Sequence, residues 1–193
     1  MKNKGLIITL CAILGVALIF GIMCISTYNG LVSEEESLNE LKGNVQSTLQ
    51  RRNDLIPNLV STVKGYAAHE QEVYTAIADA RAALSGATAS GDIEQMQNAN
   101  AQLDSALSRL LVVVENYPEL KANQNFIQLQ DELAGTENRI NVARIKYNEG
   151  VKTYNKKVRS FPSNIFAGMF GFETAQSFEA SESAQQAPSI SFD

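Results

Sequence analysis

His69 is the one histidine of the sequence, so metal or general acid–base chemistry would have to involve it. A zinc-protease helix carries a second histidine four residues later, and that position holds Val73. A di-metal helical bundle carries a glutamate three residues earlier, and that position holds Tyr66. The two cysteines, Cys11 and Cys24, lie in an apolar N-terminal run. We therefore expect no catalytic residue, cofactor or metal; an enzyme or ligand binder that uses a cavity between helices is the weakest alternative.

Arg52 also stands out by its type, because it occupies a position where the surrounding pattern favours Leu or Ile. Apolar residues recur at steps of three and four from Leu49 onward, and only Arg52 and Glu70 are charged in this series. A buried guanidinium needs a carboxylate or carbonyl partner. We expect Glu70 to be that partner, reached through another helix or another subunit. Structural pairing is the favoured interpretation of Arg52 and Glu70, and a ligand or partner contact is the alternative.

The elements that would position these residues are long helices. Three segments carry the three-four spacing, over residues 49–84, 93–117 and 126–154. Such spacing gives a narrow apolar stripe of the kind that packs in a helical bundle. The stretch LSGATASGD predicts a loop in which Asp92 caps the next helix, and ENYPEL places Pro118 at the start of another.

The stretch RRNDLIPNLV places Pro57 inside the first of these segments. One helix over residues 28–84 would be about twice as long as its neighbour. A turn at Asn53 and Asp54 would give four helices of similar length, with Asp54 as N-cap and Pro57 in the first turn. The unbroken spacing on both sides of Pro57 favours instead a continuous, kinked helix. We favour the turn, and hence an all-α, up-and-down antiparallel bundle of four helices rather than three.

An apolar run precedes the bundle. Residues 6–25 read LIITLCAILGVALIFGIMCI, twenty residues without a charge, and a helix of that length crosses a hydrocarbon core of about 30 Å. We expect a transmembrane anchor over residues 1–27, with a cleaved signal peptide as the alternative. Lys2 and Lys4 precede the run and three glutamates follow it, so the N-terminus is expected in the cytoplasm and the bundle outside the cytoplasmic (inner) membrane.

The residues after the expected bundle, which we place at 28–160, are apolar and aromatic. Residues 161–172 read FPSNIFAGMFGF, and we take Phe161, Phe166, Phe170 and Phe172 as interaction candidates. The segment 161–178 is expected to fold back as a cap, with contact to lipid or a partner as the alternative. Residues 179–193 are expected to form a flexible tail with a short terminal strand.

Charge argues against nucleic acid as a partner. The chain has a formal charge of −5, and without Lys2 and Lys4 there remain 14 basic and 21 acidic residues, or −7. Nucleic-acid binding depends instead on clustered basic side chains.

Several long strings in order resemble the LemA family of bacterial membrane-anchored helical proteins. They are YNGLV, LQRRNDLIPNLVSTVKGYAAHE, ENYPELKANQNFIQLQDEL, TENRINVARIKYNEGVKTYN and FPSNIFAGMFGF, together with Ala80-Arg81. The resemblance covers about residues 28–178, is poor over 85–101, and implies four antiparallel helices behind one membrane helix. It implies no catalytic residue. It suggests partners in the cell envelope, among them a membrane peptidase.

The sequence thus favours a membrane-tethered scaffold or adaptor. We expect it to contact the lipid bilayer, to form homo-oligomers and to dock envelope proteins. The alternative is a membrane-shaping or lipid-surface-binding protein that uses residues 161–172. Asp54 and Pro57 join the interaction candidates named above.

Overall fold

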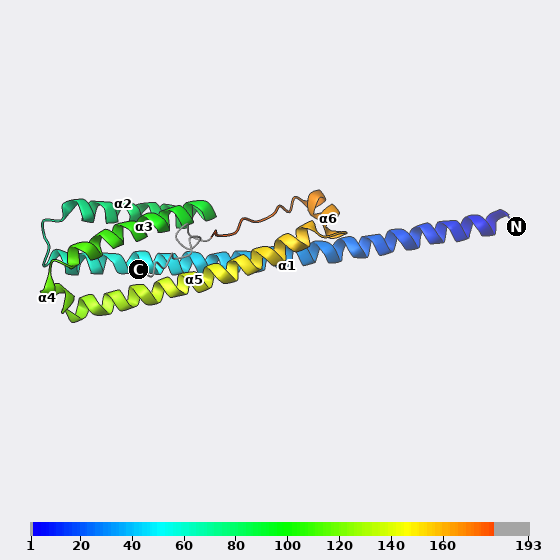
Figure 1. The fold of residues 1–193 in the computed structure, drawn as a ribbon. Coiled ribbons are helices and arrows are strands. Elements are labelled where there is room, and N and C mark those ends of the chain that lie inside the picture. Colours follow the sequence, from blue (N-terminus) through cyan, green and yellow to red (C-terminus); the bar gives the residue numbers. More distant parts are fainter. Residues whose placement is uncertain (1, 180–193) are drawn as a thin grey trace, which may run out of the picture. The chain divides into compact units, whose positions relative to one another are not determined.

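The computed structural model describes residues 2–179, and side chains from residue 8 onward. Over these residues the chain forms helices and no strands (Figure 1). The helices are α1 (Lys2–Lys64), α2 (Gln71–Ser90), α3 (Ile93–Val114), α4 (Pro118–Lys121), α5 (Gln124–Arg159) and α6 (Ser163–Phe170). The predicted all-α class is confirmed. The predicted terminal strand and the tail beyond Glu179 lie outside the described residues.

The described residues divide into two compact units. The bundle unit contains residues 41–148 and the segment from Gln176 to Glu179, and the α6 unit contains the residues up to Glu40 and residues 149–175. Helices α1 and α5 each contribute residues to both units. Each unit is described separately below.

Four helices run alternately up and down in the bundle unit: the C-terminal part of α1, then α2, α3 and α5 (Figure 1). Their seam is formed by the residues of the predicted stripes. The side chains that are almost fully buried there include Leu49, Ile56, Leu59, Ile77, Leu84, Met96, Leu103, Leu110 and Ile140. Complete burial of one such side chain contributes about 1.5–3 kcal/mol, so this seam is the main source of the unit's stability.

The position predicted for the first corner is wrong. Helix α1 continues through Asn53, Asp54 and Pro57 and ends at Lys64, and the chain turns over residues 65–70. The turn begins at Gly65. The Tyr74 hydroxyl of α2 donates to the carbonyl of Ala67 in the turn at 2.6 Å and so ties the turn to α2. Within residues 41–148 the four helical segments are still of similar length. The corner lies further along the chain than predicted.

The other helix ends agree with their sequence signals. Asp92 caps α3, accepting a hydrogen bond from the Gln95 amide at 2.8 Å. Gly91, just before it, has a φ of 68° that an L side chain adopts at a cost. Pro118 stands at the first position of α4, where its missing N–H breaks no helical bond.

Helix α6 lies in the other unit with the N-terminal part of α1. Phe166 and Ala167 of α6 are buried, and the Phe166 ring lies 5.7 Å from the Phe20 ring. Lys157 donates to the carbonyl of Gly30 at 2.7 Å and lies 3.2 Å from a Glu34 carboxylate oxygen. A Cβ at residue 30 would lie 3.1 Å from the Lys157 Nζ, so glycine there permits the close approach.

The apolar run belongs to α1. Among the described residues α1 is the one helix long and apolar enough to cross a membrane, and its candidate window is not buried in protein. Its large apolar side chains from Ile8 to Ile25 are exposed, most by more than half. This arrangement is consistent with a membrane anchor.

Candidate functional site

Arg52 is buried in the seam of the bundle unit, with 8% of its side chain exposed. Its guanidinium joins three helices. Nη2 forms an ion pair with Asp104 of α3, and Nη1 donates to the Asn100 amide oxygen at 2.8 Å and lies 2.8 Å from a carboxylate oxygen of Glu137 on α5. The prediction that Arg52 must find a carboxylate or carbonyl partner is therefore confirmed, with two carboxylates.

Helix geometry explains why these partners converge. Asn100 and Asp104 lie one turn apart on α3 and so share a face, and the Asn100 amide donates to the second Asp104 oxygen at 3.1 Å. The Asp104 and Glu137 side chains are 47% and 37% exposed. Solvent screens the two carboxylates, whereas the guanidinium between them is buried. The cluster is thus one buried cation held by two half-exposed anions.

An apolar groove lies over this cluster, which we call the Arg52 groove. Its volume is about 380 Å³. Its walls come from α1, α3 and α5 and include Leu59, Leu107, Leu111, Leu133 and Ala134, with Arg52, Asp104 and Glu137 at the polar end. Leu111 is 43% exposed, and its chain neighbour Val112 is 70% exposed. The groove therefore presents apolar surface to solvent next to a net negative charge.

Two polar atoms at this end have no hydrogen-bond partner within the described residues. Arg52 Nε and Glu137 Oε2 are buried and form no hydrogen bond, although Glu137 Oε2 is in ion-pair contact with Arg52 Nη1. Buried polar atoms are usually hydrogen-bonded. Of these two atoms, Glu137 Oε2 is paired with the guanidinium, and Arg52 Nε is without a partner among the described residues.

The groove combines apolar walls with one guanidinium and two carboxylates, a lining that suits binding. The described residues contain no cluster of three or more metal-ligating side chains, and the groove holds no histidine, cysteine or lysine. His69 lies exposed in the turn between α1 and α2. The arrangement suits an apolar group that carries hydrogen-bond donors or positive charge.

The structure separates Glu70 from Arg52. Glu70 stands at the N-cap position of α2, at the end of the turn, with no side-chain capping bond. The expected pairing of Arg52 with Glu70 is wrong, because the charge is met by α3 and α5 instead. Asp54 is no N-cap either: it is exposed on α1 and accepts a hydrogen bond from Gln50 at 2.8 Å.

Pro57 is inside α1, where its ring nitrogen cannot donate to the carbonyl four residues earlier. That carbonyl belongs to Asn53, which is buried. Arg81 of α2 donates its Nε–H to this carbonyl at 3.2 Å, and the Asn53 side-chain oxygen lies 3.3 Å from the same nitrogen. An arginine from the next helix thus satisfies the acceptor that the proline leaves free.

The aromatic candidates lie in the α6 unit. Phe161 is 81% exposed and Phe166 is 3% exposed. The Phe170 and Phe172 rings flank Tyr28 at centroid distances of 5.0 and 5.8 Å. The segment thus packs part of its rings against α1 and presents the rest to the surroundings.

The Tyr-Asn pairs of α5 bind an extended segment of the chain. Asn148 exchanges hydrogen bonds with the backbone of Phe178, at 2.8 and 2.9 Å, and the Tyr147 hydroxyl donates to the carbonyl of Gln176 at 3.0 Å. Burial raises the pKa of Tyr147 above its ordinary value. These hydrogen bonds join α5 to the segment.

Sequence reasoning missed Asn100, Asp104, Glu137 and Arg81. Asn100 carried a signal, because it is a polar residue at a seam position of its own stripe, as Arg52 is. Asp104 follows one turn later on the same face. Glu137 and Arg81 lie on polar faces with many other charges, so their roles depend on helix pairing that the sequence does not specify.

Comparison with known proteins identifies the family. The sequence model of the LemA family matches residues 42–192. Magnetosome protein MamQ 2 of Paramagnetospirillum magneticum (strain AMB-1) is 27% identical over 175 residues, covering 79% of this chain and 64% of its own. MamQ of Magnetospirillum gryphiswaldense is 26% identical, covering 78% and 64%. Protein LemA of Metamycoplasma hominis is 25% identical over 166 residues, covering 85% and 74%. The chain thus spans less than two thirds of the length of these MamQ relatives. With more than half of its length matched by the family model, this chain belongs to the LemA family.

Proposed function

We propose that this chain is a membrane-tethered, non-catalytic scaffold or adaptor of the bacterial cell envelope, which acts by oligomerisation or by docking envelope proteins. The observation that carries the proposal is the Arg52 groove, an apolar surface open to solvent beside a charge cluster that ties three helices together. The likeness to relatives named magnetosome proteins fits a membrane-associated role.

The occupant proposed for the groove is a helix with apolar and basic side chains. Leu107, Leu111 and Leu133 would receive the apolar residues. Asp104 and Glu137 outnumber the one guanidinium between them, so the groove favours a positively charged partner. Helix-in-groove recognition of this kind is common among proteins that bind amphipathic helices.

Photocrosslinking in living cells tests the docking. A photoreactive residue at Leu111 is expected to give defined adducts well above the 21.0 kDa chain. The matched control is Gln128, which is exposed on α5 and lies about 200° around the helix from Gln130 of the groove. An adduct of twice the chain mass would indicate a second copy of this chain. An adduct of another mass that contains a different protein would indicate an envelope partner. Equal crosslinking from both positions, or none from Leu111, would contradict docking in the groove.

The proposed topology is a single pass with the N-terminus in the cytoplasm. Cys11→Ser with Cys24→Ser leaves a chain without cysteine. In that background we expect a membrane-impermeant maleimide to label Ala83→Cys, exposed on α2, in intact spheroplasts. Asn3→Cys should be labelled only after lysis. The reverse pattern would overturn the topology.

A specific observation supports a second candidate function, binding of the membrane surface. Phe166 of α6 contacts Phe20, which belongs to the apolar run of α1. If that run spans a bilayer, α6 lies at its edge, where Phe161 and Met169, 81% and 67% exposed, meet the lipid interface.

The chain contains no tryptophan, so Phe161→Trp gives a single fluorescent probe of this contact. In proteoliposomes with brominated lipids, its fluorescence is expected to be quenched. The control is Tyr66→Trp, in the turn between α1 and α2, where the tyrosine is 40% exposed. Its fluorescence intensity should not be quenched. Equal quenching of the two probes, or none at residue 161, would count against lipid contact by α6.

A further inference from the structure

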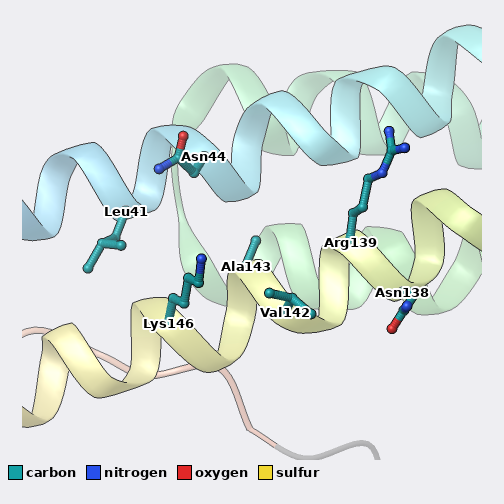
Figure 2. Close-up of a pocket in the computed structure, with 7 residues that line it drawn as sticks. All are labelled: Leu41, Asn44, Asn138, Arg139, Val142, Ala143 and Lys146. Atoms are coloured by element: carbon teal, nitrogen blue, oxygen red, sulfur yellow. The ribbon is translucent and has the colours of Figure 1, made fainter.

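A second groove lies in the bundle unit between α1 and α5. Its volume is about 280 Å³. Its floor is formed by Leu41 of α1 with Val142 and Ala143 of α5, and Asn44 lies on its rim (Figure 2). Val142 is 46% exposed. We call it the Arg139 groove, after one of its cations; it shares no lining residue with the Arg52 groove.

Two cations flank this apolar floor. Arg139 and Lys146 lie two turns apart on α5, and Figure 2 shows both side chains extending toward α1. Both are exposed, and within residues 2–179 neither forms an ion pair. A matching occupant therefore carries an apolar or aromatic side chain next to a carboxylate.

The chain itself carries such a segment. Residues 190–193 read ISFD, with Ile190 and Phe192 as apolar side chains and Asp193 as the carboxylate. The family match extends through residue 192, so it includes Ile190 and Phe192 of this stretch but not Asp193.

The described chain ends at Glu179, which is held against α5 by Arg144. Arg144 donates to the carbonyl of Glu179 at 2.8 Å, and its guanidinium lies 5.1 Å from the Phe178 ring. Arg144 directly follows Ala143 of the groove floor, although it faces another side of α5. The 13 residues after Glu179 that lead to Phe192 can span about 40 Å when extended, and a helix with its side chains is about 10–12 Å wide. The tail is thus long enough to pass around α5.

We propose that residues 190–193 of the same chain occupy the Arg139 groove. Phe192 lies on Leu41 and Val142, and the Asp193 carboxylate lies between Arg139 and Lys146. Attachment at Arg144 gives the tail a local concentration of about millimolar, so a weak contact suffices. The groove is then a site for an apolar-aromatic-acidic peptide, and it is filled by the chain's own tail independently of any partner in the Arg52 groove.

Disulfide trapping in the full-length, detergent-solubilised protein tests this proposal. In the Cys11→Ser, Cys24→Ser background, Asn44→Cys on the groove rim is paired with Ser191→Cys, which leaves Phe192 in place. The matched control pairs Ser191→Cys with Gly43→Cys. Residue 43 is exposed, a Cβ there meets no atom within 4 Å, and it points about 100° away around α1.

We expect the intrachain disulfide at residue 44 to form about tenfold faster than at residue 43, because docking concentrates the tail at the groove. Phe192→Ser, or Arg139→Glu with Lys146→Glu, should remove that difference. Arg139 and Lys146 are exposed, so their replacement should leave the bundle folded. Equal rates of disulfide formation at residues 43 and 44 would overturn the proposal. So would a rate at residue 44 that is unchanged by Phe192→Ser. A disulfide-linked dimer would overturn it as well, because the tail would then come from a second copy.

Discussion

Arg81 supplies to the Asn53 carbonyl the hydrogen bond that Pro57 cannot form. The proline interrupts the backbone bonding of α1 at one point, and at that point α2 provides the donor. Apolar contacts along the seam are non-directional. This polar contact instead specifies which residue of α2 lies opposite which residue of α1.

The relationship predicts a coupled pair of mutations. Arg81→Ala leaves the buried Asn53 carbonyl without a donor, which should lower the free energy of unfolding by about 1–3 kcal/mol. In a Pro57→Ala background a helical N–H becomes available to the same carbonyl, so Arg81→Ala should cost about 1 kcal/mol less there. Urea unfolding of the four proteins measures the coupling. Arg109→Ala, exposed on α3, is the control, and additive effects of the Pro57 and Arg81 changes would refute the relationship.

Removing both carboxylates of the Arg52 cluster should lower the free energy of unfolding by more than the sum of the two single changes. Asp104→Asn or Glu137→Gln alone leaves one carboxylate beside the guanidinium, and each should cost about 1 kcal/mol or less, because both carboxylates are screened by solvent. The double variant leaves a buried cation without an anion and should lose roughly 3 kcal/mol or more. Adding Arg52→Met should recover much of that loss by removing the charge. Chemical denaturation checks the series, and a double variant equal to the sum of the singles would be the contrary result.

Asp92 should behave as a helix cap. Asp92→Ala removes the acceptor of the Gln95 amide and should cost about 1 kcal/mol, whereas Asp92→Asn keeps an oxygen there and should cost a few tenths. Asp79→Ala, exposed within α2, is the comparison. Thermal unfolding measures the three variants, and similar losses for Asp92→Ala and Asp92→Asn would show that the cap does not stabilise α3.

Because of Tyr147, the free energy of unfolding should change with pH in the alkaline range. Its pKa is raised in the folded protein by burial, so the folded state holds the proton more tightly than the unfolded state. Its contribution is therefore fully present below the ordinary tyrosine pKa of about 10 and is lost as the pH rises through the raised value. Tyr147→Phe should be less stable by about 1 kcal/mol at pH 8, because the bond to Gln176 is lost, and this gap should narrow above about pH 10. Urea midpoints from pH 8 to 11 measure the gap; a constant gap would contradict the effect of burial.

The fold was predictable to the level of four helices and their stripes, but not to the position of the first corner. The spacing of three and four runs from Val63 through Tyr66 and Glu70 to Ile77 without a break, although a turn lies between. Tyr66 and Ala67 give this turn an apolar character, and Pro57, the stronger turn signal, is accommodated inside α1 because Arg81 replaces its missing bond. Local signals therefore favoured the wrong site, and a contact between helices decided the outcome.

The candidate site was half predictable for a related reason. A lone arginine in an apolar stripe implies a buried charge that needs anions, and that inference required only the spacing around Arg52. Which anions meet it depends on helix order: with the corner at residues 65–70, α3 and α5 face Arg52, and Glu70 is left at the turn. Asn100 was the one partner with a signal of its own, as a second polar residue in a stripe.

The bonds between Asn148 and Phe178 have a consequence for variation in this region. The asparagine amide pairs with the backbone N–H and C=O of residue 178, much as one strand of a sheet pairs with the next, so it recognises the main chain and not the side chain. Substitutions at residue 178 other than proline can keep this attachment. Asn148 itself has less freedom: glutamine offers the same donor and acceptor, but its amide lies one methylene further from the backbone. The Phe178 ring is constrained separately, because it is buried and lies 5.4 Å from the Tyr147 ring. The bonds therefore constrain Asn148, and ring packing constrains residue 178.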